Sequence, residues 1–249
     1  GEGAEPITAE RRGELAVHLD RAGRRAEAFD ALLAAADATE VLAPAAALGH
    51  LERAFELWPD GDSSAGPDAR AHRMWQAAEL AAGAAGNAHA VTLARAAFEL
   101  GPPPEGAARG HERLARYLWG AGRIEESRGE LERAVAALHS GEGQEAVAAV
   151  CAGLGQAELM AGRYDAAQRW CERAIDAIAP PEADVASWVM ARRVLGVVHS
   201  CLGDPDRGVS LCREARDAAP TALGRSLATL YLCVTLLDAG RNQECVDVA

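Results

Sequence analysis

A recurring glycine turn constrains this chain more than any other feature of its sequence. Gly122, Gly162, Gly203 and Gly240 each follow an apolar stretch and precede a second amphipathic stretch, and they are 40, 41 and 37 residues apart. An earlier copy surrounds Gly23. A glycine at this place suits the left-handed residue that ends a helix. The sequence therefore predicts a series of antiparallel helical hairpins joined by tight turns.

The stretch after each turn carries an apolar stripe with helical spacing. Cys171, Ala174 and Ile178 lie at i, i+3 and i+7 in one of them. Asp204 and Pro205 supply an N-cap and a proline at the first helical position of another. One hairpin cannot bury its apolar face alone, so neighbouring hairpins must stack on one another.

Composition agrees with a helical chain. Aromatic residues make up only 4% of it, and strand-forming residues are sparse, whereas hydrophobic residues reach 49%. We predict an all-α fold, a right-handed superhelix of about thirteen antiparallel helices without strands. It forms one domain over residues 1–249, with a possible subdivision near 60–67. Because the chain lacks an initial Met and stops within a predicted helix, we expect a fragment of a longer protein.

The charge balance excludes several functions. The net charge is −12, and all 25 basic residues apart from histidine are arginines without a concentrated basic stripe. Direct nucleic-acid binding by this fragment is not expected, because phosphate binding favours the opposite charge. A chain without lysine has no P-loop lysine and no Schiff-base lysine. The apolar runs are shorter than the ~18 residues that span a bilayer, so we expect a cytoplasmic protein with no membrane partner.

No catalytic or metal-binding signature is found. His111 and Glu112 begin like a zincin helix, but Ala115 stands where the second histidine would be required. Glu14 and His18 lie at i and i+4, a spacing more typical of a surface salt bridge than of a metal site. The six cysteines form no CxxC pair and are expected to be small buried hydrophobic residues. We therefore predict no enzyme activity, cofactor or metal.

When the repeats are aligned by their turn glycines, the alignment predicts which side chains face a concave groove lined by the first helix of each hairpin. The expected ligand or partner groove contains Arg109, Glu112, Arg116, Trp119, Gln156, Met160 and Arg193, followed by Leu230 and Val234. Arginines near a tryptophan suit a carboxylate, a phosphate or an acidic peptide. The alternative is that these arginines pair with the abundant Glu and Asp side chains, and that Trp119 only packs. The tryptophans at 58, 75, 170 and 188 are expected to pack in the core or at its edge.

In each repeat a small residue precedes the turn glycine, and alanines recur in the helix that follows. This pattern resembles tetratricopeptide repeats. Three segments of this chain are more specifically similar to the middle region of large ATP-binding LuxR-family regulators, which are the actinobacterial relatives of the maltose-regulon activator. These segments are residues 15–18 with 22–23, residues 50–58 and residues 118–123. Such regulators join an ATPase module, a helical-repeat region and a C-terminal helix-turn-helix. Repeats near 40 residues, longer than the usual 34, fit this family.

The resemblance implies a sensor and relay region that couples binding of an inducer or a partner to self-association. Two alternatives remain open: a stand-alone scaffold that binds a peptide or protein, and a sensor domain for a small metabolite. The expected partners are therefore another protein, a second copy of the chain, or a small-molecule inducer.

Overall fold

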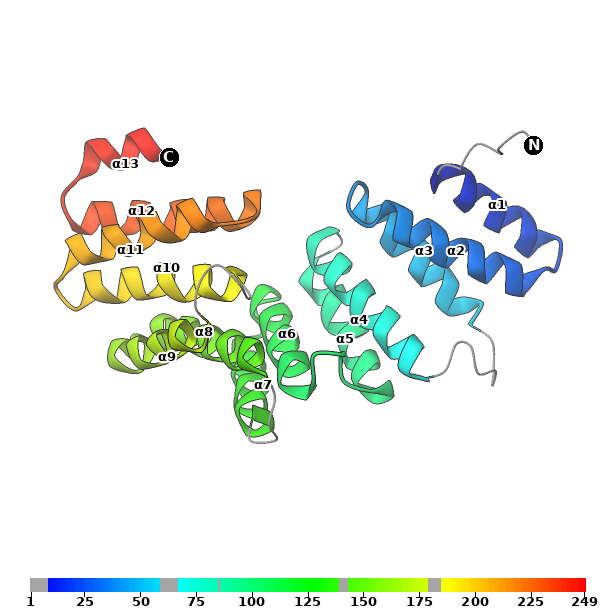
Figure 1. Ribbon diagram of the computed structural model, residues 1–249, viewed down its shortest axis with the longest axis horizontal. Coiled ribbons are helices and arrows are strands. Elements are labelled where there is room, and N and C mark those ends of the chain that lie inside the picture. The colour runs from blue at the N-terminus through cyan, green and yellow to red at the C-terminus, as the bar shows by residue number, and fades with distance from the viewer. Residues whose placement is uncertain (1–8, 59–66, 85, 139–142, 179–184) are drawn as a thin grey trace. The chain divides into compact units, whose positions relative to one another are not determined.

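A computed structural model describes residues 9–58, 67–84, 86–138, 143–178 and 185–249, and these residues contain thirteen α-helices and no strand. The helices are α1 (Ala9–Arg21), α2 (Arg25–Thr39), α3 (Pro44–Glu56), α4 (Pro67–Ala84), α5 (Asn87–Leu100), α6 (Ala107–Gly120), α7 (Ile124–Ala137), α8 (Gln144–Met160), α9 (Tyr164–Ala177), α10 (Val185–Cys201), α11 (Pro205–Ala218), α12 (Ala222–Asp238) and α13 (Asn242–Val248) (Figure 1). The predicted all-α fold class and its helix number are confirmed.

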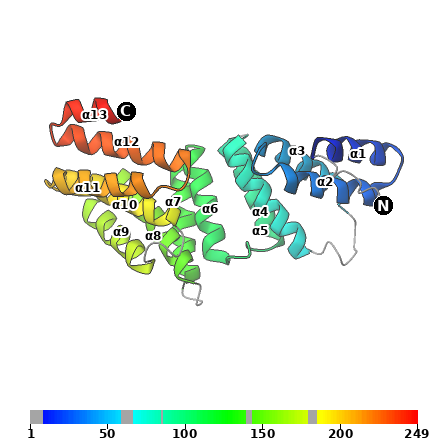
Figure 2. The same ribbon diagram turned by 45° about the horizontal axis from the view of Figure 1, so that its top comes forward.

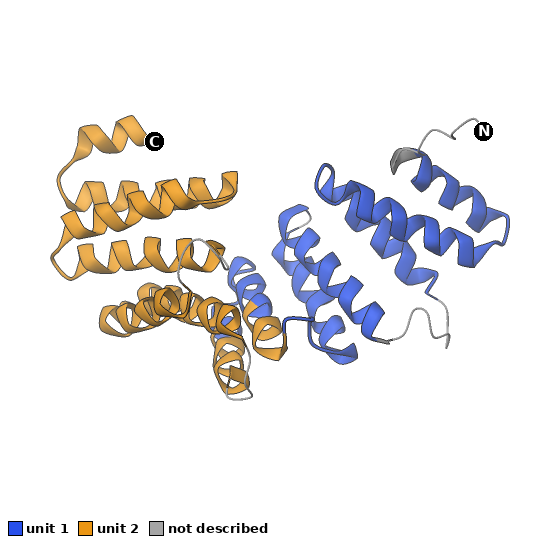
Figure 3. Cartoon of the chain, viewed as in Figure 1, with its two compact units in different colours: residues 1–105, 113–127 blue, residues 106–112, 128–249 orange. Residues whose placement is uncertain are grey.

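The chain forms two compact units (Figure 3). Unit 1 comprises residues 1–105 and 113–127, and unit 2 comprises residues 106–112 and 128–249. Helices α6 and α7 contribute residues to both units. The predicted subdivision near 60–67 falls largely on residues outside the described part of the chain, so it stays a prediction.

The turn glycines have the backbone conformation that their positions require. Gly122, Gly162, Gly203 and Gly240 have φ between 70° and 95°, a region that favours glycine because side chains with a Cβ are strained there. Each of them follows a first helix and precedes a second one. At the third turn, the Asp204 side chain accepts a hydrogen bond from the backbone N–H of Arg207 at 3.1 Å, which caps α11.

In unit 1, successive helices pack as neighbours along the chain. Helix α2 contacts both α1 and α3, and α4 forms a hairpin with α5 (Figure 2). The core between α4 and α5 includes Trp75, whose ring meets Phe98 edge-on at a centroid distance of 4.8 Å. The Trp75 indole N–H donates to the carbonyl oxygen of Gly101 at 3.1 Å.

In unit 2, α8 pairs with α9 and α10 pairs with α11, and the first helix α10 also packs against the first helices α8 and α12. A glycine in each of two first helices faces a cysteine in the second helix. A Cβ on Gly155 would lie 2.4 Å from the Cys171 Sγ, and a Cβ on Gly196 would lie 2.4 Å from the Cys212 Sγ. Because these glycines lack a side chain, the paired helices can approach closely.

Candidate functional site

The seven predicted groove residues are divided between the two units. Arg116 and Trp119 belong to unit 1, and Arg109, Glu112, Gln156, Met160 and Arg193 belong to unit 2. That all seven line a single groove stays a prediction. Each unit is therefore described by itself.

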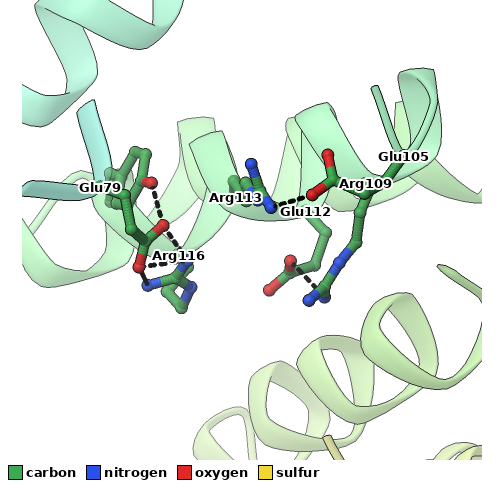
Figure 4. Close-up of polar contacts among 7 residues, drawn as sticks. Glu79, Glu105, Arg109, Glu112, Arg113 and Arg116 are labelled. Carbon is green, nitrogen blue, oxygen red and sulfur yellow. Dashed lines mark hydrogen bonds and ion pairs between the residues drawn. The ribbon is translucent and has the colours of Figure 1, made fainter. Parts of the chain in front are cut away.

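Arg116 binds a carboxylate of its own chain. Its guanidinium forms an ion pair with Glu79 of α4, with an Nη2–Oε2 distance of 2.9 Å (Figure 4). The Tyr117 hydroxyl donates to the same Glu79 carboxylate at 2.5 Å. The Arg116 guanidinium also lies 5.0 Å from the centre of the Tyr117 ring. These contacts match the alternative in which this arginine serves helix packing, here between α6 and α4.

Two opposing effects act on the Glu79 carboxyl group. Burial by itself raises its pKa, but the charge of Arg116 and the hydrogen bonds from Arg116 and Tyr117 outweigh burial. Together they lower the pKa of Glu79 from 4.5 to about 2. The folded state therefore holds this group in its ionised form more strongly than the unfolded chain does.

Acidification from pH 4.5 to about pH 2 is expected to lower the free energy of unfolding of unit 1, because Glu79 becomes protonated in this range. Because the pKa is lower in the folded state, the stabilisation is complete above pH 4.5 and is lost as the pH falls through this window. The Glu79→Gln variant should lose less of its thermal midpoint than the wild type between pH 6 and pH 3. Glu99→Gln, at an exposed carboxylate of α5, is the control. Equal losses in Glu79→Gln and the wild type would contradict the assignment.

The other predicted groove residues of α6 differ in exposure. Arg109 pairs with Glu112 along the helix at 3.0 Å, and Glu112 is buried. Trp119, in the part of α6 that belongs to unit 1, has an exposed fraction of 46%. The other tryptophans pack as predicted: Trp75 and Trp188 are buried, whereas Trp58 and Trp170 are partly buried.

A polar contact joins three repeats of unit 2. Gln156 of α8 is 7% exposed, and its Oε1 accepts a hydrogen bond from the Tyr231 hydroxyl of α12 at 2.6 Å. The guanidinium carbon of Arg193, from α10, lies 4.9 Å from the centre of the Tyr231 ring. We call Gln156, Arg193 and Tyr231 the hub. Its members come from the first helices of three consecutive hairpins.

The hub retains hydrogen-bond donors without acceptors. Within the described part of the chain, the Gln156 Nε2 and the Arg193 Nε are buried and have no hydrogen-bond partner. No carboxylate among the described residues pairs with Arg193. Burial lowers the pKa of the Arg193 guanidinium, which the Tyr231 hydroxyl opposes. Burial of an unpaired polar group is unfavourable by about 1–3 kcal/mol, so such donors are rare in folded proteins.

Apolar side chains surround the hub along the same helices. Met160 lies four residues beyond Gln156 on α8 and is 56% exposed. Leu230 and Val234, on either side of Tyr231 in α12, are 57% and 39% exposed. Gln156, Met160 and Arg193 were predicted to face the groove from the sequence, whereas Tyr231 was not. The combination of a buried amide and an unpaired guanidinium is visible only in the structure.

A separate depression lies in unit 1 over α1, α2 and α3. Its volume is about 690 Å³, and its lining includes Val17, Leu32, His50 and Arg53. Arg53 already forms ion pairs with Asp20 and Glu56, and burial lowers the pKa of His50. This depression is mainly apolar and offers little that would orient a polar ligand.

The cysteines of the central repeats behave largely as predicted. Cys151, Cys171 and Cys212 are buried, and burial raises the pKa of their thiols to about 11, about 12 and about 12. Such thiols are poor nucleophiles because little thiolate forms at neutral pH. Cys201 departs from the prediction because it is exposed, and Cys233 and Cys245 are partly exposed.

The described residues contain neither a metal-binding group nor a membrane span. Among these residues, no group of three or more His, Cys, Asp or Glu side chains is arranged to hold a metal ion. None of the described helices combines the length and apolar character needed to cross a bilayer.

Comparisons with known proteins identify the fold. The chain matches no protein-family model and no curated protein. Among solved structures, it is similar to BtubC from P. vanneervenii, with a TM-score of 0.60 and 19% identity over 84% of this chain and 87% of that chain. A Podosopora anserina protein with nearly identical TPR-like repeats gives a TM-score of 0.52 and 18% identity, covering 73% of this chain and 92% of that one.

A chain of the APC/C hetero-tetramer Cut9–Hcn1 gives a TM-score of 0.64 at 12% identity. The match covers 93% of this chain but 40% of that chain. These likenesses establish a tetratricopeptide-like helical-repeat fold, as the glycine turns predicted.

Proposed function

We propose that this chain is a non-catalytic interaction scaffold, and that a peptide segment of a protein partner lies along the first helices of unit 2. The observation that carries the proposal is the hub with its apolar surroundings on α8, α10 and α12. Exposed Met160, Leu230 and Val234 supply apolar contact area, and the partly exposed Arg193 of α10 supplies a charged group. The presence of one structural neighbour in the Cut9–Hcn1 hetero-tetramer fits a role in assembly.

Selection from a phage-displayed library of random dodecapeptides tests this proposal. We expect the purified chain to enrich a defined set of peptides that bind in solution as synthetic peptides. Met160→Glu should weaken their binding about tenfold or more, because it places a charge where apolar contacts form. Leu202→Glu is the matched control, since Leu202 is an apolar residue in the turn between α10 and α11 that is 46% exposed, close to the 56% of Met160. Failure to enrich peptides, or equal binding to both variants, would contradict the proposal.

A finer proposal is that this scaffold is the relay region of a LuxR-type, ATP-binding transcriptional regulator, in which partner or inducer binding drives self-assembly. The resemblance of residues 15–18 with 22–23, 50–58 and 118–123 to such regulators supports it. The structural likeness adds nothing to this regulator context, because it extends to the fold alone. The complete open reading frame decides the matter: a nucleotide-binding motif before this region and a helix-turn-helix after it are required, and absence of both would contradict it.

A further inference from the structure

The two helices of a hairpin approach each other at a recurring pair of positions. One position lies seven residues before the turn glycine, in the first helix, and the other lies five residues after it, in the second helix. In three successive hairpins both positions hold small residues. These pairs are Ala115 with Ser127, Gly155 with Ala167, and Gly196 with Gly208.

The contacts at these pairs show how close the two backbones come. The Ser127 hydroxyl donates to the Ala115 carbonyl oxygen at 2.7 Å. A Cβ on Gly208 would lie 2.5 Å from the Gly196 carbonyl oxygen, which is closer than Cβ atoms approach an oxygen in proteins. A short side chain on one helix therefore reaches the backbone of the other helix at this pair.

Two cysteines occupy the same pair of positions in the last hairpin. Cys233 of α12 lies seven residues before Gly240, and Cys245 of α13 lies five residues after it. The Cys233 thiol donates to the Cys245 carbonyl oxygen, with an Sγ–O distance of 3.9 Å. Burial and a hydrogen bond with the Cys245 thiol both raise the pKa of Cys233. The two thiols therefore lie in contact between the two helices.

This position suits a disulfide bond. A disulfide joins residues whose Cα atoms lie about 4.4–6.8 Å apart, so two helices must approach closely to be joined by one. The thiols of Cys233 and Cys245 are both partly exposed, so a small oxidant reaches them in the folded chain. The buried thiols are those of Cys151, Cys171 and Cys212.

Helix α13 is the element that such a bond would hold. It has seven residues, all within the described part of the chain, and none of them is buried. It packs against α12, and Cys245 and Val248 are its partly buried apolar contacts with the core formed by α11 and α12. A short helix with so few buried contacts opens easily by local unfolding.

We propose that Cys233 and Cys245 form a reversible disulfide that fastens α13 to α12 when the chain meets a peroxide. The thiolate of one cysteine attacks the O–O bond of hydrogen peroxide, which gives a sulfenic acid and releases one water after protonation. The second thiol then attacks the sulfenic sulfur, so that an S–S bond forms and a second water leaves. The two thiols lose two electrons, the peroxide gains them, and a dithiol reductant reverses the step.

Peptide mapping tests whether the bond forms. The reduced chain is treated with hydrogen peroxide, its remaining thiols are alkylated in denaturant, and it is digested with trypsin. Cleavage after Arg225 and Arg241 places the two cysteines on separate peptides, 226–241 and one that begins at Asn242. We expect these peptides to be joined and to be lighter by two hydrogen atoms than their sum. Dithiothreitol should separate them.

Hydrogen exchange tests what the bond does. Because the disulfide restricts the opened state of the last hairpin, the amides of α13 should exchange about 10- to 100-fold more slowly in the oxidised chain than in the reduced chain. Amides of α10 should exchange at the same rate in both. The Cys245→Ser variant should show no response of α13 to peroxide, and the rates of α10 report whether this variant is folded.

Cys201→Ala is the matched control, because it removes the exposed thiol of α10 and leaves the pair intact. It should form the same joined peptides and show the same slowing of α13. Joined peptides that contain Cys201, or free thiols at both Cys233 and Cys245 after oxidation, would overturn the proposal. A disulfide that forms without slowing the exchange of α13 would show that it does not fasten this helix.

Discussion

Replacing Gly196 with alanine is expected to destabilise unit 2 by about 1–3 kcal/mol or more, the range observed when well-packed interiors are overfilled. The new Cβ would lie 2.4 Å from the Cys212 Sγ and 2.8 Å from the backbone oxygen of Gly208. The second contact involves the backbone of α11, which moves only if α10 and α11 separate. Urea unfolding followed by circular dichroism, with hydrogen exchange of α10 and α11, measures the effect.

The equivalent glycine of the preceding repeat provides an internal comparison. A Cβ on Gly155 would also lie 2.4 Å from a thiol sulfur, that of Cys171, but the nearest backbone oxygen is 3.4 Å away. Combining Gly155→Ala with Cys171→Ala should therefore restore most of the lost stability. Combining Gly196→Ala with Cys212→Ala should restore only part of it, because the contact with Gly208 remains.

The control for both substitutions is Gly129→Ala in α7, within unit 2. A Cβ there meets no atom within 4 Å. Alanine at this helical position should raise stability by about 0.5–1 kcal/mol, because it lowers the conformational entropy of the unfolded chain. If Gly196→Ala also left stability unchanged or raised it, the close approach of α10 and α11 would be wrong.

The helices and their turns could be predicted from local sequence because local rules determine them. A left-handed residue after a helix requires glycine, and Gly162 and Gly203 have positive φ as expected. Asp204 caps α11 through its own side chain, a contact that spans three residues. Such features depend on residues that are close in sequence, and a single sequence contains them.

Contacts between repeats could not be predicted in the same way. The repeated pair of Gly155 with Cys171 and Gly196 with Cys212 is visible as equal 41-residue spacings, but the sequence does not indicate that each cysteine touches its glycine. The hub joins residues 75 positions apart, and this contact depends on how three hairpins stack. The register of the repeats therefore predicts a groove position for Gln156 and Arg193, but it does not indicate that Tyr231 contacts both of them.

Arg116 illustrates the limit imposed by irregular repeats. The sequence left open whether it faces a ligand or pairs with an acidic side chain. Its partner Glu79 is 37 residues earlier, in α4, outside the series of turns at Gly122, Gly162, Gly203 and Gly240. The pairing depends on the packing of α6 against α4, so the structure was needed to find it.

Replacing Trp75 with alanine is expected to destabilise unit 1 by about 3–5 kcal/mol, the range for removal of a large buried aromatic side chain. Trp75 is 1% exposed, packs edge-on against Phe98 and donates to the Gly101 carbonyl oxygen. The substitution leaves a cavity between α4 and α5 and an unpaired carbonyl oxygen at the end of α5. Trp119→Ala is the matched control, because Trp119 is 46% exposed and its loss should change stability by only about 0.5 kcal/mol. Urea unfolding with hydrogen exchange of α4 and α5 compares the two variants, and similar losses in both would show that Trp75 does not anchor this core.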